Sequence, residues 1–344
     1  MKLPILLATC LTLFFCTTAA LAQAPVIAPV NIIFDTDMGN DVDDALALAM
    51  LHALQSRHEV HLLAVTTTKD NKWVAPYVDL VNTFYGHPEI PIGTVRNGKT
   101  PESNPMIQLP SERRRPDGTF VYPHRIVDGA AAPDAASLLR KSLAGQPDGS
   151  VVIVQVGFST NLARLLDTKP DAASPQDGHT LVSRKVRLLS VMAGNFANGQ
   201  SEFNLAQDVP SAVKLFHEWP SPIVVSGFEI GAAIPIPAPR IEHDFAYIQD
   251  HPVADAYRAY MKMPYDRPAW DLTAVLYAVR PDEGYFSLSP PGIITVSTDG
   301  GSRFSTSAGG NRRHLVLTQE QRARTLEAMI LLASQPPSGG AAPH

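Results

Sequence analysis

The chain has 344 residues, 45% of them hydrophobic and 18% charged, which is enough apolar material for one large or two ordinary globular domains. Its formal net charge of -5 provides no broad positive surface, so we expect no nucleic-acid partner. Cys10 and Cys16 are the only cysteines, and both lie near the amino terminus. A mature protein without that segment would have no disulfide, no cysteine-ligated zinc and no thiol nucleophile.

The first 22 residues have the form of a secretory signal peptide. Lys2 precedes an apolar run at residues 3–15, and small residues then end in Ala20-Leu21-Ala22, an Ala-x-Ala cleavage site. An uncleaved membrane anchor is the alternative interpretation. Thr9 and Phe15, which precede the two cysteines, do not fit a lipoprotein cleavage site. We expect an exported protein, periplasmic or secreted, that has no membrane contact after cleavage.

An aspartate-rich turn at residues 35–44, which we call the aspartate turn, follows the first predicted strand. The apolar residues 32–34 predict a buried strand, and residues 45–51 predict a helix. Between them lie five carboxylates, Asp35, Asp37, Asp41, Asp43 and Asp44. Carboxylates this close raise one another's pKa, so the turn predicts a bound cation.

Predicted strands and helices alternate along the rest of the chain, which favours an α/β fold with an open, mostly parallel, doubly wound sheet. We expect one domain over residues 23–334 and a disordered tail at residues 335–344. Residues 93–132, polar and rich in proline, predict a long functional loop or flap. The other predicted elements are strands at residues 59–68, 151–156, 186–192 and 222–226, a helix at 72–85, a hairpin at 292–306 and a closing helix at 318–333.

The residues after the predicted strands offer oxygen ligands. Ligands of such sheets bind at the carboxyl ends of the strands, where this chain has the aspartate turn, Asn71, residues 157–161, residues 193–204 and Glu229. Oxygen ligands without histidine or cysteine suit a hard cation, and a partly closed site of this kind fits calcium better than magnesium or zinc.

Three segments together resemble the inosine/uridine-preferring nucleoside hydrolase family. They are DTDMGNDVDDALAL at residues 35–48, EFNLAQDVPSA at 202–212 and WDLTAVLYAVRP at 270–281, in the family's order and at comparable intervals. The resemblance extends from about residue 31 to about residue 332, without most of the 93–132 segment. It implies an active site at the carboxyl ends of the strands, calcium as cofactor and a small-molecule nucleoside as partner. It also implies that a calcium-bound water hydrolyses the N-glycosidic bond of ribonucleosides to base and ribose for nucleoside salvage, in a possible homo-oligomer.

The resemblance assigns roles to individual residues. Asp37 would be the catalytic base and a metal ligand, and the other ligands would be Asp44, Asp271 and the backbone carbonyl of Val156. The residues expected to contact the substrate are Asp43, Asn71, Asn195, Asn198, Glu202, Asn204 and Trp270. Apart from the resemblance, Asp35 could ligate the cation directly, but we expect it to brace the turn by accepting backbone N–H bonds. Without the resemblance, the start of a helix explains Glu202 and Asn204 as well as a sugar-binding site does.

Two departures from the family pattern affect these roles. Asn40-Asp41-Val42 makes the aspartate turn two residues longer than the shortest form of the motif, so Asp41 could replace Asp43. Trp270 stands where many relatives have a histidine that protonates the leaving base. A tryptophan there resembles the purine-preferring branch, in which stacking on the base makes an acid unnecessary, and it suggests a purine preference; Trp270 could equally be core. His124 is a candidate replacement acid.

Two other functions remain as alternatives. A non-catalytic, calcium-dependent nucleoside or sugar-binding protein would have the same ligands, and export and the missing histidine fit lost chemistry. A haloacid-dehalogenase-type phosphatase also has Asp-x-Asp after a strand, but Met38-Gly39 and the doubled Asp43-Asp44 fit its motif poorly.

Overall fold

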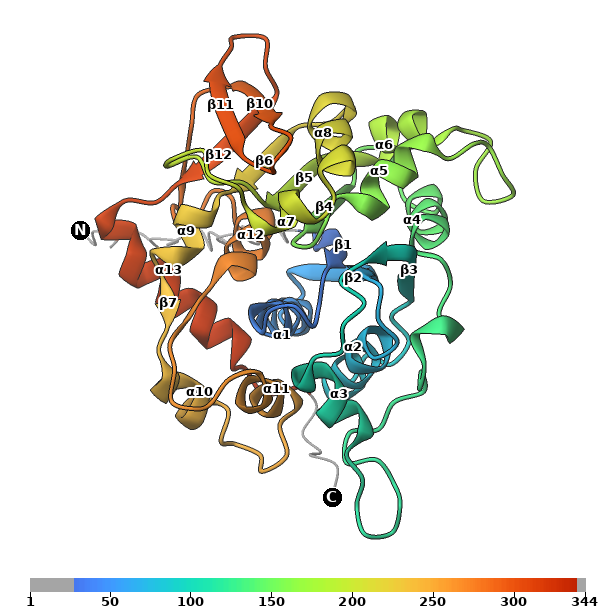
Figure 1. The fold of residues 1–344 in the computed structure, drawn as a ribbon, viewed down its shortest axis with the longest axis vertical. Helices are drawn as coiled ribbons and strands as arrows, with labels where there is room; N and C mark the ends of the chain where they lie inside the picture. Colours follow the sequence, from blue (N-terminus) through green and yellow to red (C-terminus); the bar gives the residue numbers. More distant parts are fainter. Residues whose placement is uncertain (1–27, 339–344) are drawn as a thin grey trace, which may run out of the picture.

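The computed structural model describes residues 28–338, and a ten-stranded sheet lies at its centre (Figure 1). In spatial order the strands are β11 (Ser302–Thr306), β10 (Gly292–Val296), β12 (Arg312–Val316), β6 (Ile223–Ser226), β5 (Val186–Met192), β4 (Val151–Gln155), β1 (Val30–Thr36), β2 (Val60–Lys69) and β3 (Ile92–Lys99). The short β9 (Ser287–Leu288) pairs with β12, and β7 (Pro235–Ile236) and β8 (Arg267–Pro268) form a separate two-stranded sheet. The predicted signal peptide lies outside the described residues, as does most of the predicted tail.

Helices cover both faces of the sheet (Figure 1). On one face lie α1 (Asp43–Ser56), α2 (Val74–Phe84), α12 (Trp270–Val279) and α13 (Gln319–Ala333), and on the other lie α4 (Ala135–Ala144), α5 (Thr160–Asp167), α6 (Gly178–Lys185) and α8 (Val209–Glu218). The other helices lie toward the periphery and beyond the strand ends: α3 (Pro105–Glu112), η1 (Gly129–Ala131), α7 (Phe203–Gln207), α9 (Phe228–Ala232), α10 (Ala238–Asp244) and α11 (Pro252–Tyr260).

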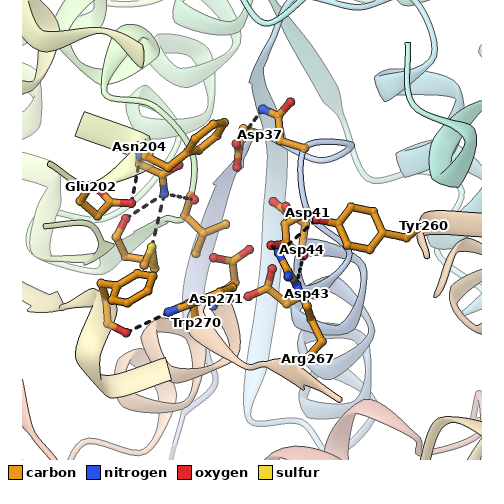
Figure 2. A pocket seen from close by; sticks show the side chains of 15 residues that line it. Asp37, Asp41, Asp43, Asp44, Glu202, Asn204, Tyr260, Arg267, Trp270 and Asp271 are labelled. Atoms are coloured by element: carbon orange, nitrogen blue, oxygen red, sulfur yellow. Dashed lines mark hydrogen bonds and ion pairs between the residues drawn. The ribbon is translucent and has the colours of Figure 1, made fainter. Parts of the chain in front are cut away.

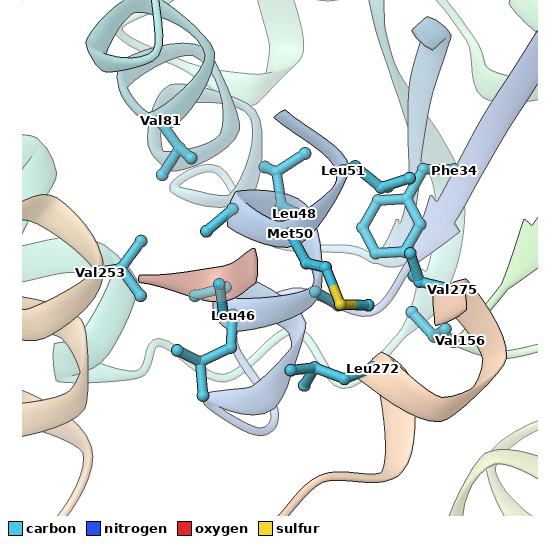
Figure 3. Packing of buried hydrophobic residues seen from close by; sticks show 14 of the residues in the cluster. Phe34, Leu46, Leu48, Met50, Leu51, Val81, Val156, Val253, Leu272 and Val275 are labelled. Carbon is cyan, nitrogen blue, oxygen red and sulfur yellow. The ribbon is translucent and has the colours of Figure 1, made fainter. Parts of the chain in front are cut away.

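Side-chain alternation along the central strands builds a separate core on each face. In β1, Phe34 packs into the cluster with α1 and α12, whereas Ile33 packs into the cluster on the opposite face. Figure 3 shows the first cluster, in which Phe34 lies near Met50 of α1 and Val275 of α12. A strand that is apolar on both sides can be buried between two helix layers, and this explains the continuous apolar runs in the sequence.

The strand order reverses between β1 and β4. From β1 the sheet extends through β2 and β3 in one direction and through β4, β5, β6 and β12 in the other, with all of these strands parallel. Such a reversal leaves a crevice at the carboxyl ends of the two strands, where no crossover helix covers the sheet. The aspartate turn follows β1, and Val156 follows β4, so both lie at this crevice.

The structure confirms the α/β fold and its mostly parallel sheet. Most of the predicted strands and helices agree with the observed elements to within two residues at either end, but α1 extends to Ser56, five residues beyond its predicted end at residue 51. The predicted hairpin is β10 and β11, antiparallel with Val296 opposite Ser302, and Gly300 has a φ of 83°, a conformation that glycine adopts without strain. Thr318 caps α13 through a reciprocal capping box with Gln321.

The prediction of a loop over residues 93–132 is wrong. Most of β3, all of α3 and the short η1 lie in that segment. β3 is an edge strand whose last four residues are partly or fully exposed, so its sequence lacks the apolar run of the central strands. α3 begins at Pro105 after the cap Asn104 and contains Pro110, a composition that is typical of loops.

Within residues 28–338, no helix combines the length and the apolar character that crossing a bilayer requires.

Two histidines, His52 and His251, are buried in a polar and aromatic cluster that includes Asn82 and Tyr85. His52 of α1 lies 2.9 Å through Nε2 from Asn82 Oδ1, and its ring stacks on Tyr85 with centroids 5.0 Å apart. His251 caps α11 by accepting the backbone N–H of Val253 at Nδ1, 3.2 Å away, which requires a neutral acceptor nitrogen. Burial lowers the pKa of both imidazoles to about 3.

We predict that acidification destabilises the protein through His52. Folded His52 stays neutral, whereas the unfolded chain binds a proton near pH 6.5; the stability of the neutral form is therefore complete above that pH and is lost progressively toward pH 3. His52→Gln removes this titration. The free energy of unfolding that the substitution costs should therefore be about 2 kcal/mol smaller at pH 5 than at pH 7.5. Urea unfolding at the two pH values measures the change. His179→Gln, at an exposed position, is the control. A penalty for His52→Gln that is the same at both pH values would contradict the prediction.

Candidate active site

A cavity of about 280 Å³ lies at the crevice between β1 and β4 (Figure 2). Its walls come from segments far apart in the sequence. The lining residues are Asp37, Asn40, Asp41, Asp43, Asp44, Val156, Met192, Glu202, Phe203, Asn204, Phe228, Tyr260, Arg267, Trp270 and Asp271. The cavity therefore brings together all three segments that carry the family resemblance.

Two glycines allow the strand ends to approach each other. Gly39 reverses the aspartate turn with a φ of 105°, which strains other residues. Gly157 follows β4 so closely packed that an added Cβ would lie 2.5 Å from the backbone nitrogen of Asp37. The side chains of the turn can thus lie against the residues that follow β4.

Three buried carboxylates meet at the floor of the cavity. Asp43 and Asp44 lie in the first turn of α1, and Asp271 lies in the first turn of α12, which packs against α1. One oxygen from each of the three lies within 4.8 Å of the others. The positive ends of two helix dipoles therefore converge on the carboxylates and partly offset their charge.

This cluster of three carboxylates has the chemistry of a cation site. Burial raises the pKa of Asp43, Asp44 and Asp271 well above the ordinary value, and the neighbouring carboxylates raise it further. Among the described residues, no lysine or arginine forms a hydrogen bond or ion pair with any of the three. A bound cation would compensate their charge, and the all-oxygen set of ligands fits a hard metal ion.

Asp37 lies in the same cavity and is held by an amide. Asn40 Nδ2 donates to Asp37 Oδ2 at 2.8 Å, and the buried Lys69 Nζ donates to Asn40 Oδ1 at 2.8 Å. Burial raises the pKa of Asp37 to about 7, although the hydrogen bond from Asn40 and the charge of Lys69 act in the opposite direction. Two successive hydrogen bonds, from Lys69 to Asn40 and from Asn40 to Asp37, fix the orientation of the carboxylate that the family resemblance implies is the base.

Asp35 has a bracing role and does not line the cavity. It accepts hydrogen bonds from Thr66 Oγ1 at 2.6 Å and from Asn161 Nδ2 at 2.8 Å, and it is fully buried. The sequence had suggested backbone N–H donors, whereas the structure shows side chains from β2 and α5. Asp35 thereby ties the end of β1 to the neighbouring strand β2 and to helix α5.

Glu202 and Asn204 form the opposite wall. Glu202 caps α7 and accepts the backbone N–H groups of Asn204, Leu205 and Gly194 at 3.0 to 3.2 Å. Asn204 Nδ2 donates to the carbonyl oxygen of Val156 at 2.8 Å. Glu202 and Asn204 therefore lie at the start of a helix and also line the cavity. The Val156 carbonyl oxygen keeps a second lone pair that a metal ion could use.

The remaining wall is aromatic and carries one guanidinium. Trp270 Nε1 donates to the Phe228 carbonyl at 2.9 Å, and the two rings lie 5.3 Å apart. Arg267 binds Asp41 in a bidentate manner, with Nε 2.9 Å from Oδ1 and Nη2 on Oδ2. Asp41 thus pairs with an arginine and does not join the three carboxylates on the cavity floor.

Three predicted substrate contacts do not line this cavity. Asn71 Nδ2 donates to the Pro101 carbonyl at 2.7 Å, and Asn198 accepts the backbone N–H of Gln200. Asn195 is buried, and its backbone N–H donates to Ser302 Oγ at 2.9 Å. His124, the candidate acid, contacts the Tyr122 carbonyl at 2.7 Å and is also absent from the lining. The geometry therefore gives no support to Asn71, Asn195 and Asn198 as substrate contacts or to His124 as the acid.

Several other residues of the site were not predicted from the sequence. Asn40 lies inside the aspartate turn and Lys69 ends β2, so both stood at the strand ends where ligands were expected. Arg267 precedes Trp270 by three residues, and the strand-end argument does not reach it. Phe203, Phe228 and Tyr260 carried no signal that separates a cavity wall from ordinary core or surface.

The family model described as inosine-uridine preferring nucleoside hydrolase matches residues 32–330. The chain belongs to this family. Nucleoside hydrolases act on small nucleosides and are metal-dependent, so the protein is a hydrolase acting on N-glycosyl compounds. The buried cluster of three carboxylates could bind the metal ion.

Solved structures of nucleoside hydrolases share the fold. The inosine-uridine preferring enzyme from Bacillus anthracis is 17% identical, with a TM-score of 0.65 over 89% of this chain and 99% of that one. A purine-preferring ribonucleoside hydrolase from Gardnerella vaginalis is 18% identical, with a TM-score of 0.63 over 88% and 98%. An inosine-guanosine nucleoside hydrolase is 19% identical, with a TM-score of 0.65 over 88% and 98%. No curated protein matches the sequence.

We predict that Asp271→Asn raises the melting temperature in chelator and reduces the stabilisation that calcium provides. In chelator the variant should melt at a higher temperature than the wild type, because one of three mutually repelling buried carboxylates is gone. Calcium at about 100 times its dissociation constant should stabilise the wild type by about 2.7 kcal/mol, roughly 5 °C, and the variant far less. Differential scanning calorimetry measures both effects, with the exposed Asp299→Asn as control. An undiminished calcium shift in Asp271→Asn would exclude Asp271 from the metal site.

Proposed function

We propose that the protein hydrolyses the N-glycosidic bond of ribonucleosides to free base and ribose, with calcium as its cofactor and purine nucleosides as its preferred substrates. One observation carries the proposal. A single cavity combines the buried Asp43, Asp44 and Asp271 with the fixed carboxylate of Asp37 and the Glu202–Asn204 wall. These groups match the needs of the reaction, which are a metal, a proton acceptor and polar contacts for a sugar.

The ligands favour calcium over other cations. The carboxylates of Asp37, Asp44 and Asp271 and the carbonyl of Val156 would hold the ion, and Asp43 lies in the same group of oxygens. Several carboxylates with a backbone carbonyl are typical calcium ligands, whereas zinc prefers nitrogen and sulfur. When bound, the ion would position the attacking water and make it more acidic.

Asp37 accepts the proton of the attacking water in this proposal. Burial raises its pKa to about 7, and the hydrogen bond from Asn40 fixes the direction in which its carboxylate points. A base must lie within hydrogen-bond reach of the proton that it takes, and Asp37 lines the cavity beside the carboxylate cluster. The anionic surroundings would also stabilise the positive charge that develops on the ribose as the bond breaks.

The polar wall and the aromatic wall suit different parts of a nucleoside. Glu202 and Asn204 can accept hydrogen bonds from a ribose hydroxyl, because a carboxylate has more lone pairs than its three backbone donors use. Trp270 is only partly buried, and its indole edge is anchored on Phe228. A purine would cover more of this aromatic surface than a pyrimidine, which is the basis of the proposed preference.

The test is release of ribose from inosine, guanosine, adenosine, uridine and cytidine, with chelator and with calcium restored. We expect purine nucleosides to be hydrolysed faster than pyrimidine nucleosides, with activity lost in chelator and regained with calcium. Asp37→Asn, which keeps the shape of the side chain, should lower kcat by about a thousandfold because it cannot accept the proton.

Two outcomes would contradict the proposal. Measurable binding of nucleosides without release of ribose from any of them would favour the non-catalytic binding protein. Turnover by Asp37→Asn near the wild-type rate would show that another group takes the proton.

A further inference from the structure

We propose that Arg267 recognises the leaving base and makes the enzyme selective for 6-oxopurine nucleosides, those of hypoxanthine and guanine, over adenosine. This inference rests on the proposed function, because it places a ribonucleoside in the cavity. It assigns a role to the pair of Asp41 and Arg267, which the metal site and the proton acceptor do not use.

The cavity is divided by the chemistry of its walls. The carboxylate cluster and the Glu202–Asn204 wall offer oxygen acceptors, and Figure 2 shows Tyr260 and Arg267 across the cavity from Glu202 and Asn204, beside Asp41 and Asp43. Ribose hydroxyls are donors and match the acceptor walls. The base is flat and carries acceptors of its own, so it matches the wall that combines aromatic rings with a guanidinium.

Arg267 is held in place before any ligand arrives. Its guanidinium lies 5.2 Å from the ring centroids of both Tyr260 and Trp270, and Nη2 donates to the Tyr260 hydroxyl at 3.0 Å. Asp41 fixes the other edge through Nε and Nη2. These five contacts hold the side chain in one conformation, so it loses little conformational entropy when a base binds, which favours selective recognition.

One amino group of Arg267 remains free for a ligand. Among the described residues, Nη1 has no hydrogen-bond partner, although the side chain is only about a quarter exposed, at 24%. Burial opposes the charge of Arg267, but the hydrogen bonds to Asp41 raise its pKa above the ordinary value. The residue therefore stays charged and donates hydrogen bonds without giving up a proton.

A 6-oxopurine presents the groups that this donor requires. O6 and N7 are adjacent acceptors on one edge of hypoxanthine and guanine, and arginine is the side chain that most often recognises them. Adenine keeps N7 but replaces O6 with an amino donor, which an arginine donor repels. A fixed Nη1 on this wall can therefore distinguish the two kinds of base.

The same contact would assist bond cleavage. When the bond between C1′ and N9 breaks, its electron pair leaves with the base, the water oxygen bonds to C1′ and Asp37 takes the water proton. The departing base carries negative charge that spreads over N7 and O6 until solvent protonates it. A guanidinium aimed at those atoms stabilises the charge as it forms, so no histidine is needed at position 270.

A structural role for the pair makes a different prediction. As a staple between the aspartate turn and β8, Arg267 would affect folding or the shape of the whole cavity, and its loss would lower activity on every substrate alike. Selectivity between bases separates the two roles.

The test compares kcat/KM for inosine, guanosine, adenosine and 4-nitrophenyl riboside in the wild type and in Arg267→Gln. We expect the variant to lose about 10- to 100-fold on inosine and guanosine, and less than about threefold on adenosine and on the aryl riboside, which has an activated leaving group. Arg280→Gln is the matched control, because Arg280 forms a similar bidentate pair with Glu59 and does not line the cavity. Equal losses on all four substrates, or no loss on any, would overturn the inference.

Calorimetric titration with hypoxanthine and adenine separates this inference from the proposed function. A wild type that releases no ribose but prefers hypoxanthine, with the preference lost in Arg267→Gln, would reject the proposed function and support the base contact. If Arg267→Gln does not fold, the double variant Asp41→Asn with Arg267→Gln leaves no unpaired charge and is measured instead. Undiminished selectivity in that variant would overturn the inference.

Discussion

Charge repulsion among buried carboxylates is the constraint on which the site depends. Asp43, Asp44 and Asp271 lie at the starts of two helices that pack against each other, and all three are removed from solvent. Their helix dipoles offset only part of the charge, because a dipole supplies about half of one elementary charge at each helix start. The fold therefore holds together a group of oxygens that is stable only when protonated or when a cation binds. The repulsion among these carboxylates would be relieved by a bound cation, so the fold itself favours metal binding.

The scaffold that holds these carboxylates was largely predictable from sequence. Apolar runs such as residues 151–154 are buried on both faces of the sheet, and a pattern of this kind identifies central parallel strands. β3 and α3 were missed because an edge strand needs no continuous apolar run and because prolines disguise a short helix. Local pattern is informative where packing is two-sided and fails at the periphery.

The candidate site was predictable where its residues lie in motifs and at strand ends. The aspartate turn, Glu202, Asn204 and Asp271 all reach one cavity, as the three family segments implied. Asn71 lies at a predicted strand end, but its side chain turns to hold the Pro101 carbonyl. The pairing of Asp41 with Arg267, 226 positions away, could not be derived from sequence, because nothing local shows which charges will meet. The direction in which a side chain points, and its pairing with distant residues, are determined by the tertiary structure.

The two inserted residues of the aspartate turn gain a meaning from that pairing. The longer turn carries Asp41 to the aromatic wall, where it orients a guanidinium, while Asp43 and Asp44 keep their places at the start of α1. The proposed metal side and the proposed base side of the cavity are thus built from one turn. In the proposed mechanism a bound cation would hold the sugar side of the cavity together, so sugar binding should depend on that cation.

Isothermal titration of ribose into the protein, with calcium and in chelator, tests this account most directly. We expect one calcium ion per chain and ribose binding that is measurable only when calcium is present. Ribose that binds equally well in chelator would contradict the account, because the carboxylate cluster would then have no part in holding the sugar.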